Sequence, residues 1–213
     1  MNVAVKSNEI GSSAEGALLV ALTEAGFPVS SVAALRDQFD MLPCPLAALL
    51  LAWIPRLADR RLQESVMWAL LSAPTGSLDG VALTELFDAT EHDELKWAIA
   101  AVINQTRPQH VDEWLMTAVC DPRSGAARNH LASAIAKMVS PEHARPVLLD
   151  LFRDAPLAAV HPLGKVGDLN VRDFLIAQQV TAIGPLRREL RQAIARIERR
   201  LMKTERNQSG GKP

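Results

Sequence analysis

The sequence lacks tyrosine and has few aromatic residues of any kind, at 4% of 213 residues. Its two cysteines, Cys44 and Cys120, form no metal-type or redox spacing and are too few for a disulfide framework. No run approaches the roughly 18 apolar residues that a membrane-spanning helix needs. The first residues also lack the charged and then apolar pattern of a signal peptide. We therefore expect a cytoplasmic protein with reduced cysteines and no membrane contact.

Short catalytic and cofactor-binding motifs are absent as well. The sequence contains no phosphate-binding loop of the G-x-x-x-x-G-K-[ST] type and no G-x-S-x-G nucleophile elbow. Its five histidines lie at least 13 residues apart, whereas metal sites on a helix place their ligands three or four positions apart. We predict no catalytic residues, no metal site and no cofactor, and this argues against an enzyme.

Apolar residues are abundant, at 48%, and many of them are alanine or leucine. β-Branched residues are scattered, and no segment alternates with the period of two that is typical of a strand. Instead, apolar residues recur at positions i, i+4, i+7, i+8 and i+11, which form one stripe along an α-helix. The first three of these stripes begin 33 and 32 residues apart, a period typical of helical repeats. The four stripes span Leu62–Ala73, Leu95–Thr106, Ala127–Met138 and Leu186–Ile197.

One repeat carries the Asp121-Pro122 pair, a nearby arginine and an alanine-rich helix, in the sequence DPRSGAARNHLASAIAKM. These features resemble the HEAT-repeat family, in particular its short bacterial HEAT-like form. The resemblance implies an all-α fold, an α-solenoid of about five helical hairpins whose second helices line a concave surface. The segment from Leu163 to Asp168 resembles the helix end and turn of such repeats, and we expect its glycines to adopt positive φ. Pro162 departs from the pattern and is expected to kink or shorten its helix.

The chain is expected to form a single solenoid domain over residues 14–203. Residues 14–41 depart most from the repeat pattern and are expected to form an N-terminal helical cap, because a solenoid must cover the apolar face of its last repeat. The repeats occupy residues 43–203. We expect residues 1–13 to be frayed and the polar tail 204–213 to be disordered.

Two tryptophans are candidate binding residues. Trp68 and Trp97 lie on the second helices of their hairpins, turned away from the main apolar stripe. Exposed aromatic side chains on a concave surface commonly anchor a partner. The alternative is that each packs sideways against the neighbouring repeat. Trp53 and Trp114, on or beside the stripes of first helices, are expected to lie in the core.

The net charge of −1 conceals a basic C-terminal helix. Residues 187–206 contain eight basic and three acidic residues, so the rest of the chain is acidic. Candidate anion-binding residues on this helix are Arg187, Arg188, Arg191 and Arg199. The alternative is an ordinary charged outer face that keeps a terminal helix soluble.

These features predict a protein-interaction module, an adaptor or scaffold that binds a protein partner along the concave face of a HEAT-like solenoid. The alternative is a nucleic-acid-binding or base-excision protein, because HEAT-like DNA glycosylases use tryptophans on the concave surface. The acidic bulk of this chain disfavours that alternative, since duplex binding needs several cationic contacts to phosphates. A third possibility, suggested by some short HEAT-like proteins, is a lyase acting on bilins. The preference for arginine over lysine hints at a GC-rich bacterial source.

Overall fold

The computed structural model describes residues 14–209, and these contain helices and no strand. The prediction of an all-α fold is therefore confirmed. Residue contacts divide the chain into two compact units, Met1–Val111 and Asp112–Pro213. The arrangement of about five hairpins in one continuous solenoid stays a prediction. Residues 1–13, which we expected to be frayed, lie outside the described residues, as do residues 210–213.

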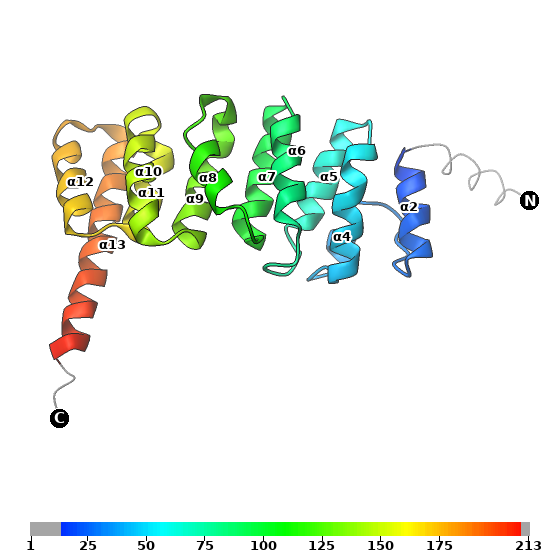
Figure 1. Cartoon of the computed structure of the whole chain (residues 1–213), viewed down its shortest axis with the longest axis horizontal. Helices are drawn as coiled ribbons and strands as arrows, with labels where there is room; N and C mark the ends of the chain where they lie inside the picture. Colours follow the sequence, from blue (N-terminus) through cyan, green and yellow to red (C-terminus); the bar gives the residue numbers. More distant parts are fainter. Residues whose placement is uncertain (1–13, 210–213) are drawn as a thin grey trace, which may run out of the picture. The chain divides into compact units, whose positions relative to one another are not determined.

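The first unit contains α2 and α3, over the segment expected to form a cap, and two helical hairpins (Figure 1). Helix α4 packs on α5 and α6 packs on α7, and the two second helices, α5 and α7, pack on each other. Helix α2 packs on α4, and its role as a cap stays a prediction. Gly26 follows α2 with φ of +87°, a conformation that glycine adopts without steric cost. The helices are α2 (Ala14–Glu24), α3 (Leu35–Gln38), α4 (Cys44–Trp53), η1 (Ile54–Arg56), α5 (Arg60–Leu70), α6 (Gly80–Ala89) and α7 (Asp93–Thr106).

The second unit repeats this pairing. Helix α8 packs on α9, α10 on α11 and α12 on α13, and each second helix packs on the next second helix. In Figure 1, α13 runs well past the end of α11, on which it packs. The helices are α8 (Asp112–Ala118), η2 (Pro122–Ala127), α9 (Arg128–Met138), α10 (Pro141–Asp154), α11 (Pro156–Val166), α12 (Leu169–Thr181) and α13 (Gly184–Ser209).

The apolar stripes found in the sequence form the core of each unit. All five stripe residues of α7 are buried, and most of those of α5, α9 and α13 are buried too. Leu62, Met138 and Leu186, each at one end of a stripe, are half-buried. Burial of an aliphatic side chain contributes about 1.5–3 kcal/mol, so these stripes supply much of the stabilisation of both units.

Three local predictions need correction. The helix expected directly after Asp121-Pro122 begins only at Arg128, because Gly125 at φ 50° and ψ −132° separates a 3-10 segment from α9. Pro162 does not shorten its helix, since α11 continues through it to Val166. Helix α13 reaches Ser209, beyond residue 204, where the disordered tail was expected to start.

The glycines near the end of α11 also serve a different purpose from the one expected. Gly167 has φ of −62°, so it does not require a left-handed backbone. A Cβ at Gly167 would lie 2.7 Å from the Cδ1 of Ile197, and one at Gly164 would lie 2.9 Å from the Cα of Ala193. The two glycines therefore allow α11 and α13 to approach closely.

Candidate interaction surfaces

Trp68 and Trp97 contact each other across α5 and α7. Their ring centroids lie 5.3 Å apart and the ring planes are inclined at 51°, within the range of favourable aromatic pairs. Both side chains are half-buried, although their sequence neighbours Met67 and Ala98 are buried in the core. The sideways packing considered from the sequence therefore occurs, and part of each indole still faces solvent.

The same two helices are also joined by an ion pair near their N-terminal ends. Arg60 at the start of α5 lies 3.8 Å from Glu94 at the start of α7, and both are largely exposed. An exposed ion pair of this kind contributes little to stability, at about 0–1 kcal/mol. The two helices thus carry an aromatic pair and an exposed ion pair, and aromatic residues are enriched at protein interfaces.

The remaining tryptophans are less buried than the sequence predicted. Trp53 and Trp114 are half-buried. The guanidinium carbon of Arg56 lies 5.5 Å from the ring centroid of Trp53, a cation–π distance. Neither residue is a core residue in the strict sense.

The four candidate arginines on α13 do not form one cluster. Arg187 and Arg191 line a hollow of about 380 Å³ between α12 and α13. The Nε of Arg188 lies 3.7 Å from the carboxylate of Glu189, and Arg199 donates to the backbone carbonyl of Ala195, 3.1 Å away. The structure therefore brings two of the four predicted residues together and separates the other two.

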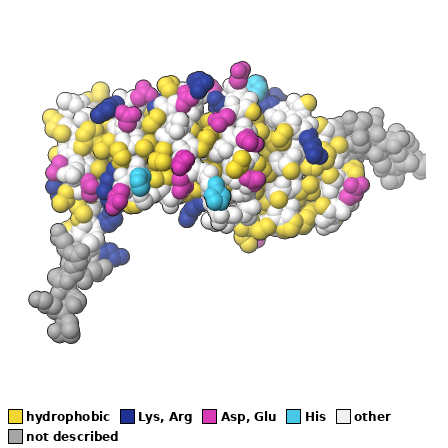
Figure 2. Space-filling view, in the orientation of Figure 1, with side chains coloured by type: hydrophobic (Ala, Val, Ile, Leu, Met, Phe, Trp, Pro, Cys, Tyr) yellow, Lys and Arg dark blue, Asp and Glu magenta, His cyan; other side chains and the backbone are white. Residues whose placement is uncertain are grey.

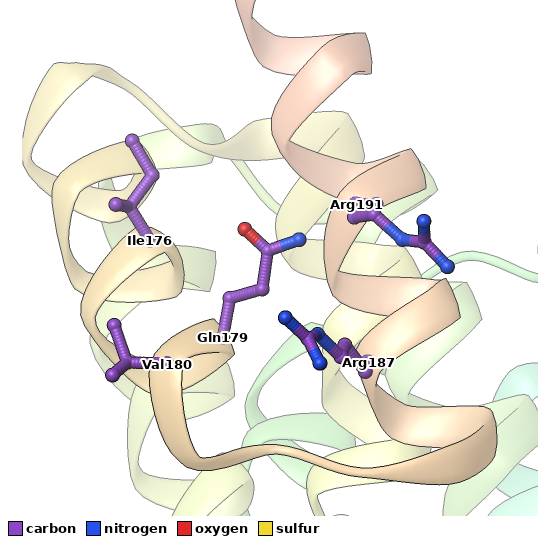
Figure 3. A pocket seen from close by; sticks show the side chains of 5 residues that line it. All are labelled: Ile176, Gln179, Val180, Arg187 and Arg191. Atoms are coloured by element: carbon purple, nitrogen blue, oxygen red, sulfur yellow. The ribbon is translucent and has the colours of Figure 1, made fainter.

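Three residues from α12 complete this hollow, and the sequence analysis did not identify them. Ile176 and Val180 project from one side of α12, and Gln179 points from α12 toward α13 (Figure 3). Leu169, Ile176 and Val180 are exposed and lie at i, i+7 and i+11, along one line of the helix. The buried residues of α12 are Val171 and Leu175, so α12 is apolar on two faces. That second apolar face was the available signal in the sequence.

Arg200 of α13 and Arg145 of α10 have a structural role. Arg200 donates to the carbonyls of Gly164, Lys165 and Gly167, at the C-terminal end of α11. From α10, Arg145 donates to the carbonyl of Val166 at 2.8 Å and pairs with Asp168 at 3.1 Å. Carbonyls in the last turn of a helix have no partner within the helix, and positive charge there is favourable. Burial, followed by the nearby Arg145 and Arg196, lowers the pKa of Arg200.

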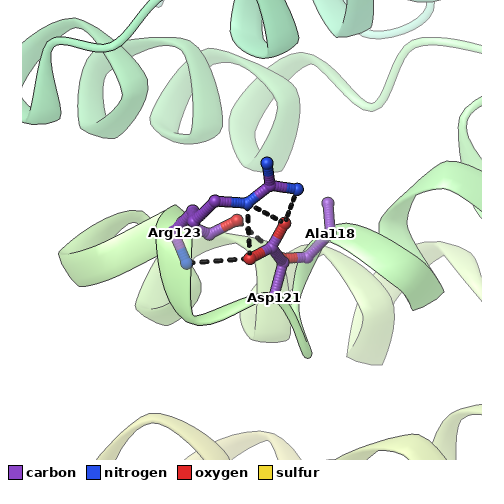
Figure 4. Close-up of polar contacts among 4 residues, drawn as sticks. Ala118, Asp121 and Arg123 are labelled. Atoms are coloured by element: carbon purple, nitrogen blue, oxygen red, sulfur yellow. Dashed lines mark hydrogen bonds and ion pairs between the residues drawn. The ribbon is translucent and has the colours of Figure 1, made fainter.

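The Asp121 turn holds η2 in place (Figure 4). The Asp121 carboxylate accepts from the backbone N–H of Arg123 at 2.8 Å and pairs with its guanidinium at 2.7 Å. The buried hydroxyl of Ser124 donates to the carbonyl of Ala118 at 2.7 Å. This network ties the end of α8 to the start of η2, which makes the turn a structural feature of the hairpin.

Arg128 is a second buried link in this hairpin. Its Nε donates to the carbonyl of Val119 at 3.0 Å, and its Nη2 lies 2.6 Å from the carboxylate of Asp154. Near it, burial raises the pKa of Cys120, Asp150 adds to the rise and Arg128 opposes it. A thiol with a raised pKa is less reactive, because the thiolate is the nucleophile.

Histidine, cysteine and carboxylate side chains form no group of three that could hold a metal ion among the described residues. Burial lowers the pKa of His130, and burial followed by Arg196 lowers the pKa of His161.

Over residues 14–209, no helix is both long and apolar enough to cross a membrane. On the face shown in Figure 2, Lys and Arg side chains stand apart from one another, with acidic side chains between them.

Comparison with known proteins identified no relative of this chain. No family model matches the chain, and neither a curated protein nor a solved structure matches it.

Proposed function

We propose that this protein is a non-enzymatic interaction module that binds a segment of a partner protein, as an adaptor or scaffold does. The observation that carries the proposal is the half-buried tryptophan pair, Trp68 and Trp97. Tryptophan is among the residues that most often dominate binding energy at protein interfaces, and a prepacked ring loses little conformational freedom on binding.

The geometry of the pair fits the role of an anchor. The two indoles already pack on each other in the absence of a partner, at a centroid distance of 5.3 Å. Because α5 and α7 are second helices, the pair lies on the helices that would line the concave face of a HEAT-like solenoid. The partner segment would place an apolar side chain against the exposed parts of the two rings, and polar groups beside Arg60 and Glu94.

The test is affinity purification with the full chain as bait, at moderate salt, with nuclease added to one of two parallel samples. Mass spectrometry then identifies the proteins retained. We expect a stoichiometric protein partner that survives nuclease, is lost from the W68A/W97A variant and is retained by W114A. The W114A variant is a matched control because Trp114 is also half-buried but lies on a first helix, α8.

Two results would overturn the proposal. A partner retained equally by W68A/W97A, with that variant shown to be folded by circular dichroism, would remove the tryptophan pair from the interface. Recovery of nucleic acid that is lost as salt rises would favour the nucleic-acid-binding alternative. The C-terminal helix offers less support for that alternative than its sequence suggests, because Arg200 is engaged with the end of α11.

A further inference from the structure

The α12–α13 hollow combines exposed aliphatic side chains with two cations. Val180 is 79% exposed, and Ile183, in the connection to α13, is 83% exposed. Contiguous exposed apolar patches mark interaction sites more often than single exposed residues do. Opposite them on α13 stand the exposed Arg187 and Arg191, which line the same hollow.

Among the described side chains, the two arginines are not paired with a carboxylate. Within residues 14–204, no carboxylate forms an ion pair with Arg187 or Arg191, whereas Arg172 and Arg188 each have a neighbouring carboxylate. Arg187 and Arg191 are four positions apart on α13, so they lie on one face of the helix, about one turn apart. They therefore present two positive charges on one side of the hollow and leave both available to an external anion.

We propose that the α12–α13 hollow binds an acidic peptide segment of a partner protein. Carboxylates of the segment pair with Arg187 and Arg191, and its apolar side chains pack on Ile176 and Val180. Gln179, which points between the two sides, has both donor and acceptor groups for the peptide backbone. This is a second binding surface, beyond the one that the tryptophan pair provides.

The lining favours a peptide over other anionic partners. Single-stranded nucleic acid is bound mainly by aromatic stacking and by a row of cations, whereas this hollow has aliphatic walls and two arginines. An anionic membrane surface would meet Asp173, which is exposed and lies on the same line of α12 between Leu169 and Ile176. Asp173 is about two turns from Val180 along α12 and is paired with Arg172 at 2.6 Å.

The test begins with selection of random peptides displayed on phage against the immobilised full chain. A selected peptide is then synthesised with a fluorophore and titrated by fluorescence anisotropy against four proteins. These are the wild type, R187E/R191E, V180S, and the matched control R188E/R199E. The control reverses the same number of charges on the same helix, at residues that do not line the hollow.

We expect the selected peptides to combine Asp or Glu with aliphatic or aromatic residues. R187E/R191E should weaken binding about tenfold or more, because two favourable pairs become repulsive. R188E/R199E should change it by less than about threefold, and V180S should weaken it through lost apolar contact. Raising the salt concentration from about 0.1 M to about 1 M shortens the screening length from about 10 Å to about 3 Å and should weaken binding further.

The proposal is overturned if the selected peptides have no acidic bias, or if they bind R187E/R191E as they bind the wild type. Two further measurements cover the other occupants. Co-sedimentation with phosphatidylserine-containing vesicles that is lost in V180S would assign the surface to a membrane. A concentration-dependent dimer in light scattering that is lost in R187E/R191E would assign it to a second copy of this chain. None of these variants changes Trp68 or Trp97. A change in binding caused by R187E/R191E or V180S is therefore independent of the proposed function.

Discussion

Gly164 of α11 lies so close to α13 that a Cβ on this residue would stand 2.9 Å from the Cα of Ala193. Contacts this short between a Cβ and a backbone atom of another helix require the helices to move apart. The substitution G164A should therefore destabilise the second unit by about 1–3 kcal/mol, the usual cost of overpacking a tight contact. Urea denaturation of the full chain measures the change.

The G164A/A193G double variant is the control for this prediction. The Cβ of Ala193 would lie 3.0 Å from the new Cβ, so its removal should restore part of the lost stability. If the double variant loses more unfolding free energy than the two single variants lose together, close approach is not the reason for glycine at position 164.

Arg200 stabilises the C-terminal end of α11 from a different helix. The substitution R200M keeps most of the apolar stem and removes the donors to the carbonyls of Gly164, Lys165 and Gly167. We expect a loss of about 1–3 kcal/mol, the range for leaving buried polar groups without a partner. R200K should recover only part of it, because a single ammonium lacks the planar fork that reaches several acceptors.

The comparison variant is R199M, which changes a neighbouring exposed arginine that donates only to Ala195 on its own helix. Its stability should stay within about 0.5 kcal/mol of the wild type, as for most surface substitutions. Equal effects of R199M and R200M on the thermal midpoint would mean that the carbonyl contacts contribute nothing specific.

The sequence predicted the helices and their buried faces well, because the period of apolar residues depends on geometry within a single helix. Contacts between helices were harder to foresee. In the sequence, Gly164 suggested a turn. Its role in close packing becomes visible only when Ala193 of α13 is seen beside it. The sequence does not distinguish Arg187 from Arg200. Arg187 lines the hollow and Arg200 binds the end of α11, because the two residues lie on different faces of α13. The hollow was missed because Ile176 and Val180 become conspicuous only once Leu175 is known to be buried.

His161 is expected to make stability depend on pH. Its Nδ1 lies 3.3 Å from Nη1 of Arg196, and because a guanidinium can only donate, this contact favours an unprotonated Nδ1. Burial, then Arg196 and Lys165, lower the pKa of His161 below its ordinary value, with Glu189 opposing them. The unfolded chain, with a pKa of about 6.5 at this histidine, therefore binds the proton more readily than the folded chain.

The sign follows from this difference. The stabilisation associated with neutral His161 is present above about pH 6.5 and is lost as the pH falls toward the lowered pKa of the folded state. H161Q should therefore lose less stability than the wild type between about pH 7 and pH 5. H92Q is the control for removing a histidine, since His92 makes no side-chain cap bond at the start of α7. Parallel stability curves for H161Q and the wild type would contradict the prediction.

The contact between Trp68 and Trp97 should appear as a coupling energy. W68A and W97A each remove half of the pair, so the double variant should lose less stability than the two single losses added together. Aromatic pairs contribute about 0.5–1.5 kcal/mol beyond the area that they bury, and we expect a coupling in this range from urea denaturation. The single losses should be smaller than those of fully buried tryptophans, because both side chains are only half-buried.

The same cycle separates a structural role of the pair from a binding role. If the rings serve only to hold α5 on α7, W68F and W97F should retain both stability and partner binding, because phenylalanine preserves an aromatic pair. If they anchor a partner as proposed, the phenylalanine variants should keep most of the stability and still weaken partner binding, since each loses indole area at the interface. Calorimetry with the purified partner and urea denaturation, measured on the same protein samples, distinguish these outcomes.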